Sequence, residues 1–111
     1  MEKALHQNQA AGDWFALSLP EQLGNVGSEV GRAAAAERQG NQARRDQALT
    51  RAYELLDLTI ADQRWRRRCR ELCRVREVLG DTFYGDKYYK DSPQALEKYF
   101  YWYAFAARKD K

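Results

Sequence analysis

The most constraining feature of this sequence is a series of helix start signals that divides it into segments of similar length. Ser18-Leu19-Pro20-Glu21 is a capping box with proline in the first turn, Asn41 and Asp62 are good N-caps, and Ser92-Pro93 repeats the cap-then-proline signal. Apolar residues follow each signal at steps of three and four, as on one face of an α-helix. These signals predict helices over about 19–39, 42–61, 63–79 and 93–108.

The short connections between these segments determine the predicted fold. Gly40 supplies a left-handed stop after the first helix, and Asp62 both ends the second helix and caps the third. Four helices of comparable length with short connections predict an all-α, antiparallel four-helix bundle. The 111 residues give room for one domain, so we expect a single bundle over 18–111 and a short extra helix or frayed segment over 1–17.

Three glycines lie along the first predicted helix, at Gly24, Gly27 and Gly31. Glycine lowers helix propensity by about 1 kcal/mol relative to alanine, so its repeated use needs a reason. We expect another helix to approach closely along this flank, with a functional hinge or ligand notch as the alternative.

Positive charge is concentrated in one short segment. Residues 63–78 carry seven arginines and two glutamates, whereas residues 1–62 carry six basic and nine acidic side chains. The planar guanidinium binds phosphate or carboxylate bidentately and also suits protein interfaces. Three interpretations are open: charge that is solvated or paired internally, a surface for a protein partner, or a nucleic-acid surface on which aromatic residues stack. The candidate binding residues are Arg64, Trp65, Arg66, Arg67, Arg70 and Arg74.

The last predicted helix is aromatic on most of its sides. A helix that is apolar nearly all round is typical of a central position or of an oligomer interface. We therefore expect a homo-oligomer, with candidate interface residues Tyr99, Trp102, Tyr103 and Phe105.

Metal and nucleotide chemistry find little support in the sequence. The single histidine, His6, has no metal ligand at suitable spacing, and Cys69 and Cys73 share a helical face but supply two of the four ligands of a tight zinc site. We expect these cysteines to serve as small packing residues. Glu-x-x-His and the glycine-rich phosphate loops do not occur. The sequence thus predicts no metal and no cofactor.

Two groups of carboxylates are the remaining candidates for catalysis. Glu54 and Asp57 lie three residues apart and could act as an acid/base pair, and a second acidic group comprises Asp81, Asp86 and Asp91. The arginines just downstream favour salt bridges for the first group, and glycine-rich surroundings favour solvated turns for the second. We expect no catalytic residue and no enzyme.

One stretch carries a family resemblance. Leu23-x-x-Val26-Gly27-Ser28-Glu29-Val30-Gly31-Arg32-Ala33, followed by the apolar stripe from Leu49 to Ile60, resembles the first hairpin of small bacterial four-helix bundles. The nearest kinds are the proteins encoded in intervening sequences of 23S ribosomal RNA genes and the accessory variability proteins. The resemblance covers about 40 residues and implies an oligomeric bacterial bundle that binds nucleic acid or a nucleic-acid enzyme.

The predicted architecture is also similar to that of the higher-eukaryote and prokaryote nucleotide-binding bundles, but this sequence lacks the motif of their ribonuclease members. Their ribonuclease members need a histidine four to six residues after an arginine, whereas here His6 precedes the first arginine, Arg32. This similarity is still compatible with an inactive member of the group, which would act as an antitoxin or as partner to a small nucleotidyltransferase.

These observations favour a non-enzymatic, self-associating interaction module that binds a protein partner. The alternative is a basic bundle that binds RNA or DNA through its arginine-rich third helix. Because no apolar run approaches the roughly 20 residues of a membrane span, and residues 1–11 lack a signal-peptide core, we expect a cytoplasmic protein without a membrane partner.

Overall fold

The computed structural model describes residues 14–84 and 95–101 of the chain. Their regular structure is helical: α2 (Leu19–Arg38), α3 (Gln42–Ala61), the 3-10 helix η1 (Gln63–Arg68), α4 (Cys69–Phe83) and a helical segment at 95–101. Over these ranges no residue belongs to a β-strand. The prediction of an all-α fold is confirmed. None of the described helices is long and apolar enough to cross a membrane.

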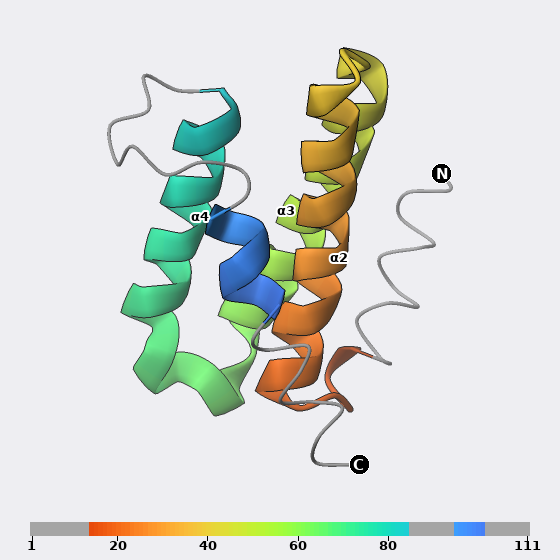
Figure 1. Cartoon of the computed structure of the whole chain (residues 1–111). Helices are drawn as coiled ribbons and strands as arrows, with labels where there is room; N and C mark the ends of the chain where they lie inside the picture. Colours follow the sequence, from red (N-terminus) through yellow and green to blue (C-terminus); the bar gives the residue numbers. More distant parts are fainter. Residues whose placement is uncertain (1–13, 85–94, 102–111) are drawn as a thin grey trace, which may run out of the picture.

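The α2 and α3 helices form an antiparallel hairpin and contact each other more extensively than any other pair among α2, α3, η1 and α4. Gly40, with φ of 74°, turns the chain between them, and an added Cβ there would meet no atom within 4 Å. The chain reverses again after α3, so that α4 runs back beside the hairpin, and the 95–101 segment lies between α2 and α4 (Figure 1).

The predicted caps form at the starts of α2, α3 and η1. Ser18 Oγ accepts from the Glu21 N–H at 3.3 Å, and Glu21 Oε1 accepts from the Ser18 N–H at 2.9 Å. Asn41 Oδ1 accepts from the Arg44 N–H at 3.1 Å, and Asp62 Oδ1 accepts from the Arg64 N–H at 3.0 Å. Asp62 is the single residue between α3 and η1, so the predicted absence of a longer turn is also confirmed.

The prediction of one regular helix over 63–79 is wrong at both ends. The segment begins as the 3-10 helix η1, within which Trp65 adopts the non-helical angles φ −106° and ψ 16°. At the other end α4 continues past Gly80 to Phe83. The reason is packing: a Cβ at Gly80 would lie 2.8 Å from the Tyr53 hydroxyl, so this glycine permits close contact with α3 and does not stop the helix.

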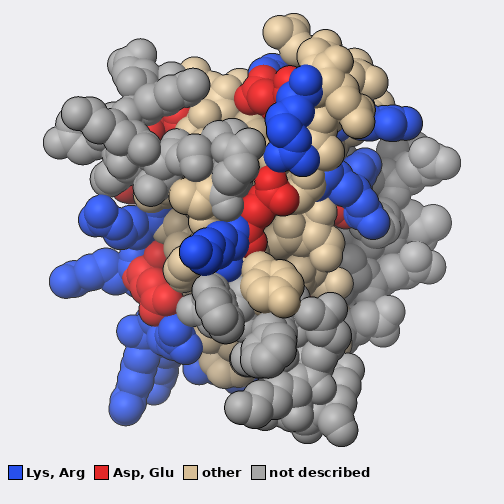
Figure 2. Space-filling model, viewed as in Figure 1, with Lys and Arg blue, Asp and Glu red and all other residues tan. Residues whose placement is uncertain are grey.

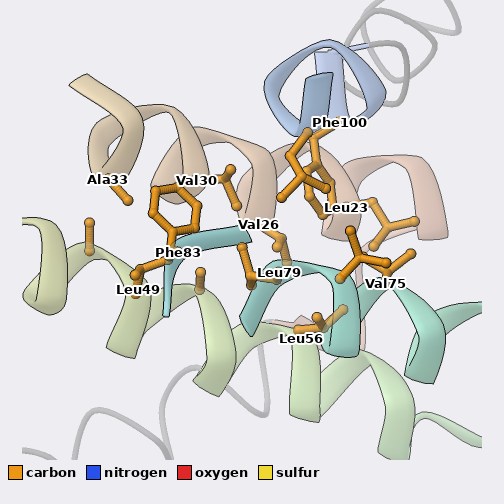
Figure 3. Packing of buried hydrophobic residues seen from close by; sticks show 14 of the residues in the cluster. Leu23, Val26, Val30, Ala33, Leu49, Leu56, Val75, Leu79, Phe83 and Phe100 are labelled. Atoms are coloured by element: carbon orange, nitrogen blue, oxygen red, sulfur yellow. The ribbon is translucent and has the colours of Figure 1, made fainter. Parts of the chain in front are cut away.

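The core is built mainly from the facing sides of α2, α3 and α4. Figure 3 shows Leu23, Val26 and Val30 of α2 close to Leu79 of α4, with Phe100 entering the cluster from the 95–101 segment. The side chains that are fully enclosed or nearly so include Leu23, Val26, Val30, Ala33, Leu49, Leu56, Leu72, Leu79 and Phe100. Burying one of these leucine, valine or phenylalanine side chains contributes roughly 1.5–3 kcal/mol relative to leaving it exposed.

The expected close approach along the glycine flank occurs at Gly27. A Cβ added to Gly27 would overlap the Cβ of Phe100, which is 1% exposed. A Cβ added to Gly31 would lie 3.7 Å from Glu97 Oε2, an ordinary contact. Gly27 is therefore what allows the 95–101 segment to rest directly on α2.

This difference between two glycines of one helix gives a stability test. We expect Gly27→Ala to destabilise the protein by about 1–3 kcal/mol, because the added methyl forces Phe100 out of its place. Gly31→Ala, the matched control, gains helix propensity without a clash and should be neutral or stabilising by up to about 1 kcal/mol. Urea unfolding of both variants makes the measurement, and equal stabilities would contradict the assigned packing.

Candidate interaction surface

The arginines predicted as a binding group separate in the structure into two sets with different surroundings. Figure 2 shows basic side chains projecting along the edge of the molecule occupied by η1 and α4 in Figure 1, with acidic atoms among them. Arg64 and Trp65 make contacts within the chain, described next. The side chains of Arg66, Arg67, Arg70 and Arg74 are exposed, and we call these four the arginine surface.

Arg64 belongs to a buried polar cluster centred on Asp62. Its guanidinium donates to Asp62 Oδ2 from Nη2 at 2.7 Å, and the same Nη2 donates to the carbonyl oxygen of Leu17 at 2.7 Å. The Asp62 side chain is 5% exposed, and Gln22 Nε2 donates to its Oδ2 at 3.2 Å. Arg64 thus neutralises a buried carboxylate and ties η1 to the residues before α2.

The aromatic residues of this cluster are held by the same polar groups. Gln22 Oε1 accepts from the Trp65 indole N–H at 2.9 Å, while Gln22 Nε2 donates to the Trp14 carbonyl oxygen at 2.9 Å. Trp14 in turn donates its indole N–H to Thr59 Oγ1 at 3.0 Å. The Arg64 guanidinium lies 4.5 Å from the centre of the Trp65 ring, a favourable cation–π position. Trp65 is half-buried, and its indole N–H is used for a hydrogen bond within the chain.

Three members of the arginine surface, unlike Arg64, make no contact of this kind within the described part of the chain. Across residues 14–84 and 95–101, Arg66, Arg67 and Arg70 form no ion pair and no hydrogen bond through their guanidinium groups. Their five N–H donors each are therefore available to an anionic ligand. Arg68, between them, pairs with Glu71 at 3.1 Å.

The arginine surface borders two depressions. One is an open hollow of about 700 Å³ lined by four arginines, Glu71, Glu77 and Cys73. The other is a groove of about 410 Å³ between α4 and the 95–101 segment, whose walls include Val75, Val78, Leu96 and Tyr99. Glu71 and Arg74 line both, so the charged hollow and the apolar groove adjoin at these two residues.

Sequence reasoning did not identify the groove. Val75 and Val78 carry the helical spacing of core residues, and both are 9% exposed at the groove wall. Whether such a position faces the core or a groove depends on where the 95–101 segment lies, which periodicity alone does not determine.

Of the candidate catalytic carboxylates, Asp57 forms the ion pair with a downstream arginine that the salt-bridge interpretation predicted. Asp57 Oδ1 accepts from Arg76 Nε at 2.7 Å, and the Arg76 guanidinium also lies 4.9 Å from the centre of the Tyr53 ring. Asp81, expected in a turn, is half-buried within α4. Among the described residues no group of three or more histidine, cysteine or acidic side chains is arranged to hold a metal.

Several predicted residues lie outside the described ranges: His6, Asp86, Asp91 and the interface candidates Trp102, Tyr103 and Phe105. Tyr99, the remaining interface candidate, is half-buried and donates its hydroxyl to Glu71 Oε1 at 3.2 Å. Tyr101, two residues on, is 53% exposed.

Comparison of the chain with protein-family models, with curated proteins and with solved structures finds no match in any of the three. The resemblance to ribosomal intervening-sequence and accessory variability proteins is accordingly untested and stays a prediction.

The Asp62 cluster predicts a specific pH dependence of stability. Hydrogen bonds from the Arg64 guanidinium, joined by those from the Arg64 and Gln22 amides, lower the pKa of Asp62 to about 2 despite its burial. Because the folded pKa lies below the ordinary value of 3.8, the carboxylate contributes its full stability above about pH 4 and loses it as the pH falls towards 2.

We expect Asp62→Asn to be less stable than the wild type at pH 7, and the difference to shrink by about 2 kcal/mol between pH 5 and pH 2. Urea unfolding of the two proteins across this range measures it. Asp57→Asn removes a carboxylate that is 54% exposed and should cost less than about 1 kcal/mol at pH 7. A constant gap between wild type and Asp62→Asn would show that the Asp62 charge contributes nothing.

Proposed function

We propose that this protein is a non-enzymatic interaction module that binds a protein partner through the arginine surface and the adjoining apolar groove. The observation that carries the proposal is that the charged hollow and the apolar groove adjoin at Glu71 and Arg74. Protein interfaces combine an apolar centre with a charged rim and are enriched in arginine. A partner segment with apolar side chains for the groove and carboxylates for Arg66, Arg67 and Arg70 matches both parts.

Nucleic acid is the second candidate, supported by Arg66, Arg67 and Arg70, which are exposed and form no ion pair within residues 14–84 and 95–101. The surroundings favour it less, because Glu71 and Glu77 lie among the arginines that line the hollow and would repel phosphates. The apolar walls of the groove also offer a sugar-phosphate backbone nothing to bind.

The architecture we propose around this surface is the antiparallel four-helix bundle, formed by α2, α3, α4 and the helix that includes residues 95–101. Its support is the hairpin of α2 and α3, the return of α4 and the contact of Phe100 with Gly27. A bacterial, cytoplasmic protein related to the ribosomal intervening-sequence bundles would fit this architecture.

Charge reversal at the arginine surface tests the proposed function. We expect Arg67→Glu and Arg70→Glu each to weaken partner binding by about 2 kcal/mol or more, close to 30-fold, because each leaves a partner carboxylate unpaired. Arg44→Glu is the matched control: Arg44 is exposed, carries the same charge and lies in the first turn of α3, at the far end of the molecule from η1.

The measurement is affinity purification from nuclease-treated lysate of the source organism, followed by titration of the protein that is retained. A protein retained by wild type and by Arg44→Glu, and lost from both other variants, supports the proposal. Titration with labelled RNA and DNA across a salt series tests the second candidate. Micromolar binding whose log K falls steeply with log salt would replace the protein partner with nucleic acid.

Self-association is the further part of this proposal, supported by the aromatic composition of 99–105 and by the exposure of Tyr101. We expect Tyr99→Ala, Trp102→Ala and Phe105→Ala each to lower the oligomer mass, measured by light scattering. Circular dichroism of each variant separates a lost interface from unfolding. Unchanged mass and stability in all three would remove these residues from any interface.

A further inference from the structure

Cys69 and Cys73 form a pair of thiols that the proposed function does not use. They lie one turn apart on α4, with their sulfur atoms 3.7 Å from each other. Both are free and half-buried, and Cys73 lines the hollow beside the arginine surface. The chain has two cysteines in all, so every thiol measurement on this protein reports on this pair.

The geometry favours a bridging atom over a direct disulfide. One helical turn separates Cβ atoms by about 5–6 Å, whereas a disulfide needs about 3.5–4.5 Å, so closing the bond would unwind the start of α4. One atom bonded to both sulfurs at about 2.3 Å, the length of a zinc–thiolate bond, would subtend an angle of about 107° at the observed separation. This angle suits a tetrahedral or pyramidal centre.

The surroundings favour a neutral ligand over a divalent cation. Four arginines and two glutamates line the hollow, which gives it a net positive charge. A hydrogen bond with Cys69, together with burial, raises the pKa of the Cys73 thiol, so a metal ion must displace tightly held protons. A zinc ion would also need two more ligands, and the described residues place no third histidine, cysteine or acidic ligand with the pair.

We propose that Cys69 and Cys73 form a dithiol binding site for neutral trivalent arsenic compounds of the arsenous acid class. Two arsenic–sulfur bonds form and two arsenic–oxygen bonds break. The two thiol protons leave with the two hydroxyl groups as water, and arsenic keeps its +3 oxidation state. The product is neutral, so neither the arginines nor the protonation of Cys73 opposes it.

The test is titration of the full chain, reduced and freed of reductant, with phenylarsine oxide. We expect one equivalent to protect both thiols from Ellman's reagent, and native mass spectrometry to show a 1:1 adduct with loss of one water. Cys69→Ala and Cys73→Ala should each bind at least about 100-fold more weakly, because a single thiol loses the intramolecular second bond. Arsenite should compete with phenylarsine oxide in the wild type.

A matched control keeps two thiols but separates them. Cys73→Ala combined with Glu77→Cys places cysteines eight residues apart on α4, about 12 Å along the axis. Equal affinity in this variant, two equivalents bound by the wild type, or no competition by arsenite would overturn the proposal. A 1:1 zinc complex tighter than the arsenical adduct would overturn the choice of a neutral ligand. Circular dichroism verifies that each variant keeps its helices.

Discussion

The buried carboxylate of Asp62 is the interaction on which the rest of the structure depends. It ends α3, caps η1, and receives hydrogen bonds from Arg64 and Gln22, so one side chain joins the second reversal of the chain to α2. A charge so well enclosed is costly unless it is paired and hydrogen-bonded, and here both requirements are met. Because Asp62 sets the direction in which the chain leaves α3, it also sets where α4 and its arginines lie.

This dependence explains why seven arginines within sixteen residues do not form one uniform surface. Arg64 and Arg76 pair with Asp62 and Asp57, while Arg66, Arg67 and Arg70 are exposed and pair with no acid in the described part of the chain. The 3-10 helix η1, with its non-helical angles at Trp65, contributes to the separation of the arginines into two sets. A 3-10 helix has about three residues per turn and an α-helix about 3.6, so the arginines of η1 and α4 project in different directions than they would on one regular helix. Of the exposed arginines, Arg67, Arg70 and Arg74 line the hollow that adjoins the apolar groove.

Local signals predicted more of the fold than of the surface. The caps at Ser18, Asn41 and Asp62 were predictable because each depends on residues within three positions along the chain. Gly80 was misread because its role is set by Tyr53, 27 residues away, and nothing in its neighbours shows that contact. For the same reason the sequence did not predict the hydrogen bond between Trp65 and Gln22, which are 43 residues apart.

The turn at Gly40 has a practical consequence. It is exposed, its backbone is in the left-handed region, and there is open space around it. In Figure 1 this turn lies at the opposite end of the α2–α3 hairpin from η1. A loop lengthened between Gly40 and Asn41 would cost little, since loop-closure entropy rises only slowly with length. An inserted epitope or fluorophore there would let the protein be immobilised or followed while the arginines, the groove and the thiol pair stay accessible.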